Sequence, residues 1–168
     1  MNNYFKNIFV LTILLLSVNS FASSLANDAR DREINETCSN YLSQIEESYG
    51  LNGLNLTFAH PNSPSIFPSL HISSQKYNNG SSSFFVTLTP DEEYCYLSSV
   101  MITAVNNQSC SEIVQIKIDS DENLQVNNYA DGGYSVLTPI DNTYQIILTT
   151  SGENSCTMTE TRMMWPGK

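Results

Sequence analysis

The side chains in this sequence with the clearest capacity for chemistry are acidic residues that cluster in two short runs. Asp91-Glu92-Glu93 is the first run, and residues 119–123 (DSDEN) form the second. Asp119, Asp121 and Asn123 match the first three ligand positions of an EF-hand calcium loop. The match then fails, because Leu124 stands where the loop requires glycine and Ala130 where it requires a bidentate glutamate. We interpret both runs as acidic turns and expect no metal, although calcium binding in another geometry stays open.

Histidine chemistry has little support in the sequence. His60 and His71 are the only histidines, and the chain has no H-E-x-x-H zinc motif and no G-x-S-x-G nucleophile elbow. A catalytic triad can still be assembled from distant residues, because triads are defined by geometry. We expect a protein that is not an enzyme and uses no cofactor. The alternative is a periplasmic hydrolase of unrecognised type, with His60 or His71 acting beside an acid from Asp91-Glu92-Glu93.

The N-terminus has the layout of a secretory signal peptide. Lys6 is followed by an apolar run over residues 8–18, and Ser20 and Ala22 are small residues suited to cleavage after Ala22. The apolar run is shorter than the ~20 residues that a membrane-spanning helix needs. We therefore predict a signal peptide over residues 1–22 and a single secreted domain over residues 23–168. The mature chain is expected in the periplasm or outside the cell, without insertion into a membrane.

The charge balance narrows the class of partner. The chain has 17 acidic and 7 basic residues, a formal net charge of −10, and loss of Lys6 with the signal peptide makes the mature chain more acidic. Nucleic acids and anionic membranes require a basic surface, so both are poor partners. An acidic body attracts a cationic protein and speeds their encounter. Acidity that serves only solubility is the alternative.

One helix and a series of strands are expected. Apolar residues recur at three- and four-residue spacing over residues 27–49, with Gly50 as a natural helix end. Beyond it the period becomes two, and no strand–helix–strand alternation or internal repeat is visible. These patterns predict an α+β fold in which one N-terminal amphipathic helix packs on an antiparallel, meander-like sheet. The expected strands are 54–58, 70–73, 84–89, 124–129, 134–138, 143–150 and 156–163.

The segment over residues 94–119 is predicted to be a long antiparallel hairpin that turns at Asn106-Asn107-Gln108. Each of its two apolar runs begins with a cysteine, Cys95 and Cys110. The open end of such a hairpin would bring the two acidic runs together in one anionic patch beside Tyr94 and Tyr96.

Four cysteines in an exported chain favour two structural disulfides over metal ligands or free thiols. Strand phase places Cys110 and Cys156 on inward faces, which suggests a Cys110–Cys156 bond and leaves Cys38–Cys95 to hold the helix. The two other pairings remain open.

The leading interpretation is a small binding protein of the inhibitor or immunity type that recognises a cationic cell-wall hydrolase or toxin. Tyrosines beside acidic turns support this, since tyrosine gives large contact area at low entropic cost; completion of the core is the alternative role for these rings. An envelope assembly protein or a host-directed secreted factor is a further alternative. The oligomeric state is undetermined. The candidate partner-binding residues are Asp91, Glu92, Glu93, Tyr94, Tyr96, Asp119, Asp121, Glu122, Tyr129, Asp131 and Tyr134.

Overall fold

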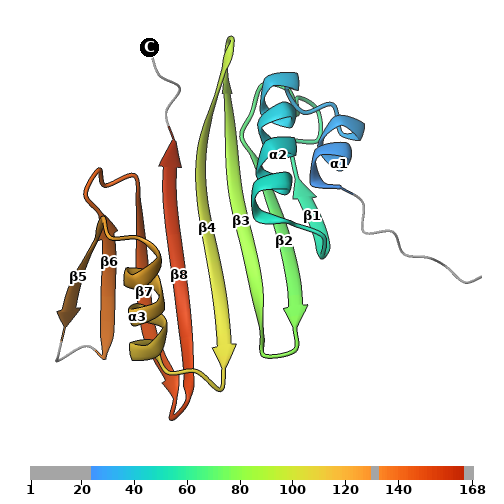
Figure 1. Cartoon of the computed structure of the whole chain (residues 1–168). Coiled ribbons are helices and arrows are strands. Elements are labelled where there is room, and N and C mark those ends of the chain that lie inside the picture. The colour runs from blue at the N-terminus through green and yellow to red at the C-terminus, as the bar shows by residue number, and fades with distance from the viewer. Residues whose placement is uncertain (1–23, 130–132, 165–168) are drawn as a thin grey trace, which may run out of the picture.

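A computed structural model describes residues 24–129 and 133–164, and this part of the chain contains three helices and eight strands. All strand pairings are antiparallel, and the strands form one sheet in the order β1-β2-β3-β4-β8-β7-β6-β5. The predicted α+β class with an antiparallel sheet is therefore confirmed (Figure 1). The elements are α1 (Leu25–Asp31), α2 (Glu36–Tyr49), β1 (Leu54–Phe58), β2 (Ser69–Tyr77), β3 (Gly80–Asp91), β4 (Tyr94–Asn106), α3 (Cys110–Ser120), β5 (Leu124–Tyr129), β6 (Tyr134–Pro139), β7 (Tyr144–Gly152) and β8 (Ser155–Met164).

The fold contains an internal repeat that the sequence did not reveal. Each half is a helix followed by a four-stranded antiparallel meander, α2-β1-β2-β3-β4 and α3-β5-β6-β7-β8. The last strands of the two halves, β4 and β8, pair with each other and join the meanders into one sheet. Val100 lies opposite Thr161, and each is the fifth residue after its strand's cysteine. The two halves are thus related by an approximate two-fold axis through this pair.

The two disulfides occupy equivalent positions in the two halves of the repeat. Cys38–Cys95 joins the start of α2 to the start of β4, and Cys110–Cys156 joins the start of α3 to the start of β8. The predicted pairing is confirmed, with Cα–Cα distances of 5.2 and 5.0 Å. Two disulfides are typical of a protein that resides in an oxidising, extracellular-type compartment. The predicted signal peptide lies outside the described residues.

The expected single helix over residues 27–49 is interrupted. α1 ends at Asp31, and the chain passes through Glu33 in the left-handed region (φ 59°) before α2 begins. Asn35 accepts a hydrogen bond from the backbone N–H of Cys38 and caps α2. Gly50 ends α2 in the left-handed conformation, as its position predicted.

The predicted hairpin over residues 94–119 is wrong in its second arm. Residues 110–120 form α3, which starts at a capping box in which Ser109 and Glu112 each bond the other's backbone N–H. Cys110, Ile113 and Val114 pack toward the second core at helical spacing, whereas Ile116 is 54% exposed. The β-branched residues of this segment suggested a strand, but its cap and this packing stabilise a helix.

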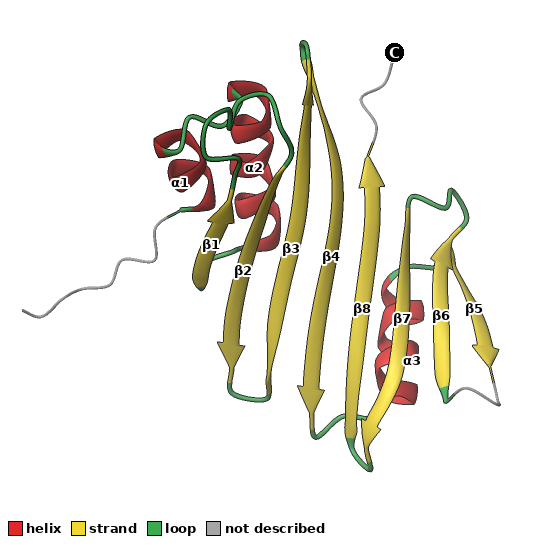
Figure 2. Ribbon diagram, turned by 180° about the vertical axis from the view of Figure 1, so that it is seen from behind, coloured by secondary structure: helices red, strands yellow, loops and turns green. Residues whose placement is uncertain are grey.

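All three helices cover the same face of the sheet, and no element of the described residues covers the opposite face, which we call the uncovered face (Figures 1 and 2). α1 and α2 cover the first core, built around Leu42, Phe84 and Leu88. α3 covers a second core around Ile113, Leu137 and Leu148. In the described part of the chain, no helix is long and apolar enough to cross a membrane.

Candidate functional site

The hairpin of β3 and β4 extends beyond its neighbours in the sheet. β2 pairs with β3 only as far as Leu88, and β8 pairs with β4 only from Leu97 onward. Within the described part of the chain, residues 89–96 are therefore paired only with each other, and Asp91 lies opposite Tyr94 at the tip. We call this two-stranded projection the finger; it rises above the rest of the sheet in Figure 1.

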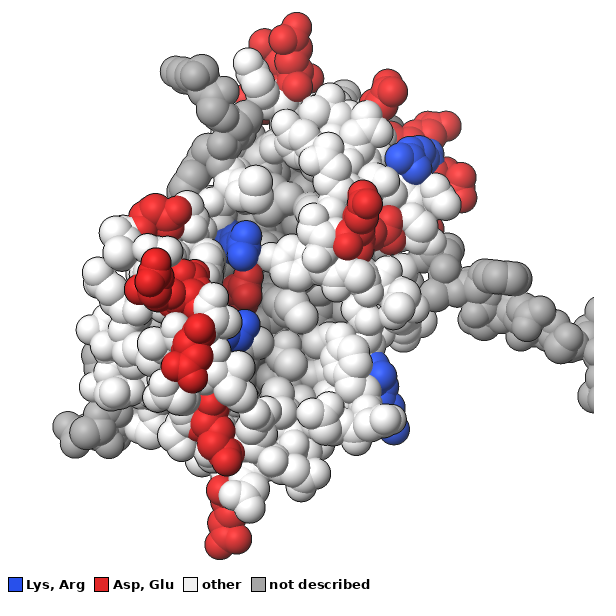
Figure 3. Space-filling view, viewed as in Figure 1, with Lys and Arg blue, Asp and Glu red and all other residues white. Residues whose placement is uncertain are grey.

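Five of the predicted partner-binding residues lie together in the finger. Asp91, Glu92 and Glu93 are exposed at its tip, and acidic side chains stand out there in the space-filling view (Figure 3). Tyr94 and Tyr96 are 45% and 37% exposed. The interaction of the Tyr96 hydroxyl with the Asp91 carboxylate raises the pKa of Tyr96. The finger thus combines three carboxylates with two exposed aromatic rings.

A disulfide ties the middle of the finger to α2. Cys95 lies within the finger, opposite Pro90, and its side chain is buried on the helix-bearing face. There it is bonded to Cys38 in α2. A hairpin fixed in this way loses less conformational entropy on binding than a free loop would.

The second acidic run lies elsewhere, and the single anionic patch predicted from the hairpin is wrong. α3 runs back along the sheet for eleven residues, whereas β4 is thirteen residues long. The rise per residue is about 1.5 Å in a helix and 3.4 Å in a strand, so the run stays roughly 25 Å short of the finger. Asp119 accepts a hydrogen bond from Gln115, and Glu122 is exposed. Burial, followed by the Asp121 carboxylate, raises the pKa of Tyr144 beside this run.

The third group of predicted residues lies at the opposite end of the sheet from the finger. Tyr129 and Tyr134 pair across β5 and β6, at the lower end of these strands in Figure 1. Tyr134 is 40% exposed, and Asp131 lies outside the described residues. The predicted binding residues therefore fall into three separate places.

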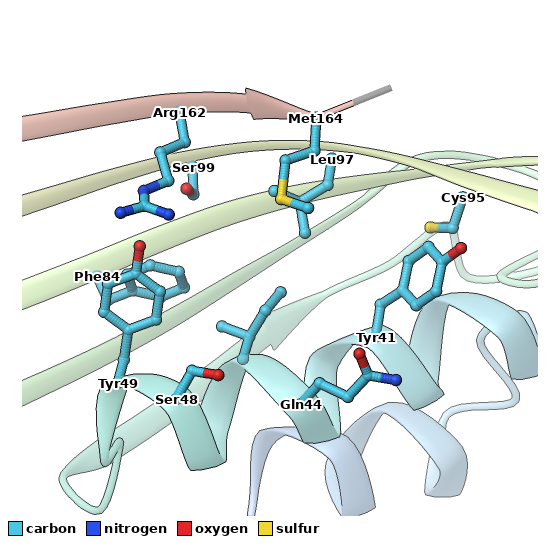
Figure 4. Close-up of a pocket in the computed structure, with 11 residues that line it drawn as sticks. Tyr41, Gln44, Ser48, Tyr49, Phe84, Cys95, Leu97, Ser99, Arg162 and Met164 are labelled. Atoms are coloured by element: carbon cyan, nitrogen blue, oxygen red, sulfur yellow. The ribbon is translucent and has the colours of Figure 1, made fainter. Parts of the chain in front are cut away.

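A groove that the sequence did not reveal runs between α2 and the β4–β8 seam. It contains a cavity of about 410 Å³, visible as part of the hollow in Figure 3 and drawn in Figure 4. Tyr41, Ile45 and Tyr49 of α2 form one wall. Leu97 and Ser99 of β4 and Arg162 and Met164 of β8 form the floor.

Charged and aromatic groups meet in this groove. The Arg162 Nε donates to the Glu160 Oε1 at 2.9 Å, and the Tyr49 hydroxyl donates to the same oxygen at 3.3 Å. The Arg162 guanidinium carbon lies 4.7 Å from the centre of the Tyr144 ring, a cation–π distance. Burial and the Glu160 carboxylate raise the pKa of Tyr49. The alternation of residues in the last predicted strand already places Glu160 and Arg162 on one face of that strand. Their position under Tyr49 could not be predicted, because it depends on the pairing of β4 with β8.

His71 is not brought together with the acids of the finger. His71 is fully buried beside β3, opposite Val86, with its ring nitrogens 3.1 Å from the Thr57 hydroxyl and 2.9 Å from the Ser69 hydroxyl. Asp91 lies five residues beyond Val86, roughly 17 Å along the strand and on the other face. His60 is exposed and stacks on Phe67. Among the described residues, no group of three or more His, Cys, Asp or Glu side chains is arranged to hold a metal ion.

His71 gives a pH-dependent prediction. Burial lowers the pKa of His71 from 6.5 to about 4, so the folded state binds this proton less readily than the unfolded state. Its contribution to stability is present above pH 6.5 and is lost as the pH falls toward 4, for a total of about 3 kcal/mol. We expect the unfolding free energy, measured by urea titration, to fall about 3 kcal/mol more between pH 7 and pH 4 in wild type than in His71→Gln. Equal losses in both proteins would show that His71 does not titrate in this way.

Comparisons with protein-family models, with curated proteins and with solved structures found no match.

Proposed function

We propose that this protein is an exported binding protein whose acidic finger engages a cationic protein, as an inhibitor or immunity-type partner of a cell-wall hydrolase or toxin. The observation that carries the proposal is the finger itself. It projects beyond the sheet, presents Asp91, Glu92 and Glu93 at its tip, and is anchored by Cys38–Cys95.

The shape and chemistry of the finger suit a concave, basic site. A two-stranded hairpin is narrow enough to enter a cleft that a sheet face cannot reach. Its carboxylates can accept charge-assisted hydrogen bonds from arginine or lysine, which are shorter and stronger than neutral ones. Tyr94 and Tyr96 add aromatic contact area of the kind found in binding hot spots.

The net charge of the whole chain supports the same partner class. A chain of charge −10 attracts a basic protein over distances set by the ionic strength, which raises the association rate. The two disulfides fit a protein that works outside the cytoplasm, where cell-wall enzymes act. We place the mature protein in the periplasm or in the secreted fraction.

The salt dependence of association tests this proposal. We expect the protein to bind a basic wall hydrolase, such as a lysozyme, with an association rate constant at least tenfold higher at low than at high salt, roughly the range of electrostatic steering. The Debye length falls from about 30 Å at 0.01 M to about 3 Å at 1 M, so most of the long-range attraction is removed. Stopped-flow or biosensor kinetics over this range measure the effect. Absence of binding to any basic hydrolase, or binding that is indifferent to salt, would refute the proposal.

A further inference from the structure

The uncovered face of the sheet carries an apolar patch in the first half of the fold. Leu56, Ile72, Phe85 and Val100 form one continuous cross-strand row from β1 to β4. Leu54, Leu56 and Phe58 are 67%, 46% and 56% exposed, and Ile102 is 38% exposed. Leu70, Ile72, Phe85 and Val100 are partly buried beside them. We call these residues the apolar patch: Leu54, Leu56, Phe58, Leu70, Ile72, Phe85, Val100 and Ile102.

The second half of the fold provides an internal comparison. The same face of β5, β7 and β8 presents mainly threonine, glutamine and asparagine, including Thr157, Thr159 and Thr161. Val136, Ile147 and Met163 are the apolar exceptions, and Tyr134 at the start of β6 also lies on this face. A solvated face of an antiparallel sheet is normally polar in this way. The first half departs from that pattern, and a contiguous exposed apolar patch marks an interaction surface.

The near absence of charge on this face favours a second copy of the chain as its binding partner. At the outward positions of the strands within residues 24–129 and 133–164, Lys76 and Asp91 are the charged residues. The other described acidic residues lie on the helix-bearing face, in turns or in loops. Two copies of a chain of charge −10 repel each other, and the repulsion is weakest where both present this nearly uncharged face.

The two charges of the face are also self-complementary. Lys76 lies near the β2–β3 turn, at one end of the strands, and Asp91 lies at the other end, in the finger. If two sheets stack face to face with antiparallel strands, Lys76 of each copy approaches Asp91 of the partner subunit. A two-fold interface always presents the same surface twice, so it needs this self-complementarity.

We propose that the apolar patch is the interface of a homodimer, formed by face-to-face packing of the β1–β4 halves of two copies. The grooves face outward on both sides of this dimer. The proposal does not rest on the identity of the finger's partner, but Asp91 belongs to both surfaces, and Glu92 and Glu93 lie outside the apolar patch.

A matched pair of variants tests the interface. Ile102 and Ile147 lie on the same face, each opposite Thr159 in one cross-strand row, and are 38% and 36% exposed. The first belongs to the apolar patch and the second to the polar half. We expect sedimentation equilibrium to show a dimer for wild type and for Ile147→Glu. For Ile102→Glu we expect a dimer dissociation constant at least 100-fold higher, roughly the cost of burying an unpaired carboxylate.

Leu56→Glu serves as a second patch variant at an exposed site, and circular dichroism checks that each variant is folded. A measurement on the wild-type protein alone does not depend on whether the variants fold. Raising its concentration should slow amide hydrogen exchange over residues 54–58 of β1 but not over residues 124–129 of β5. A monomeric wild type, a dimer that survives both patch substitutions, equal weakening by Ile147→Glu, or concentration-independent exchange in β1 would each overturn the proposal.

Discussion

Replacing Cys38 and Cys95 together with alanine is expected to lower the free energy of unfolding by about 4 kcal/mol, because the bond closes a loop with a sequence separation of 57 residues. The same change frees the finger from α2, so we also expect affinity for a cationic partner to fall by about tenfold through the added cost of ordering the hairpin. Urea unfolding followed by circular dichroism measures the first effect, and calorimetric titration measures the second.

The other disulfide is a matched control for this variant. Cys110–Cys156 spans 46 residues, so its replacement by alanines should cost a similar amount of stability, about 4 kcal/mol. It lies in the second half of the fold and does not hold the finger. Under conditions where both variants are folded, only the loss of Cys38–Cys95 should reduce affinity. An equal reduction in both would attribute the effect to general destabilisation.

Neutralising the finger is expected to have the largest effect on binding. In the triple variant Asp91→Asn, Glu92→Gln and Glu93→Gln, shape is conserved and three charges are removed. We expect the dissociation constant for a basic partner to rise at least 100-fold, about 2.7 kcal/mol, since truncated charge pairs at a desolvated interface cost a few kcal/mol each. Isothermal titration calorimetry at fixed ionic strength measures this change.

The second acidic run provides the control for net charge. A second triple variant removes an equal number of charges from the end of α3: Asp119→Asn, Asp121→Asn and Glu122→Gln. If the finger makes the direct contacts, this variant should associate more slowly but retain most of its affinity. Equal losses from the two triple variants would indicate that only overall charge matters.

Several features could be predicted because they depend on local pattern and cysteine chemistry. Residues 54–58 alternate between apolar and polar side chains and form β1 as expected, and residues 124–129 form the expected β5. The disulfide pairing was also correct, although Cys110 proved to lie in a helix. In α3 the β-branched residues pointed to a strand, whereas Ser109 and Glu112 form a capping box, a helix signal that is readable in the sequence.

The remaining features depend on contacts between distant segments. The groove needs β4 and β8 to be neighbours, and these strands are separated in the sequence by α3 and three strands. The repeat survives in the sequence chiefly as Asn35-Glu-Thr-Cys38 and Asn107-Gln-Ser-Cys110, which is too short to stand out. The apolar patch could not be recognised from the sequence either. Alternation in β1 places leucines on one face, but only the helix positions decide which face is covered.

The central claim is that the finger recognises a cationic protein, and parallel capture tests it most directly. Wild type, the finger triple variant and the α3 triple variant are immobilised at equal density and exposed to envelope and culture-supernatant extracts. We predict that a basic protein is retained by wild type and by the α3 variant and is lost from the finger variant. Retention of the same basic protein by the finger variant, or failure of wild type to retain any, would contradict the account.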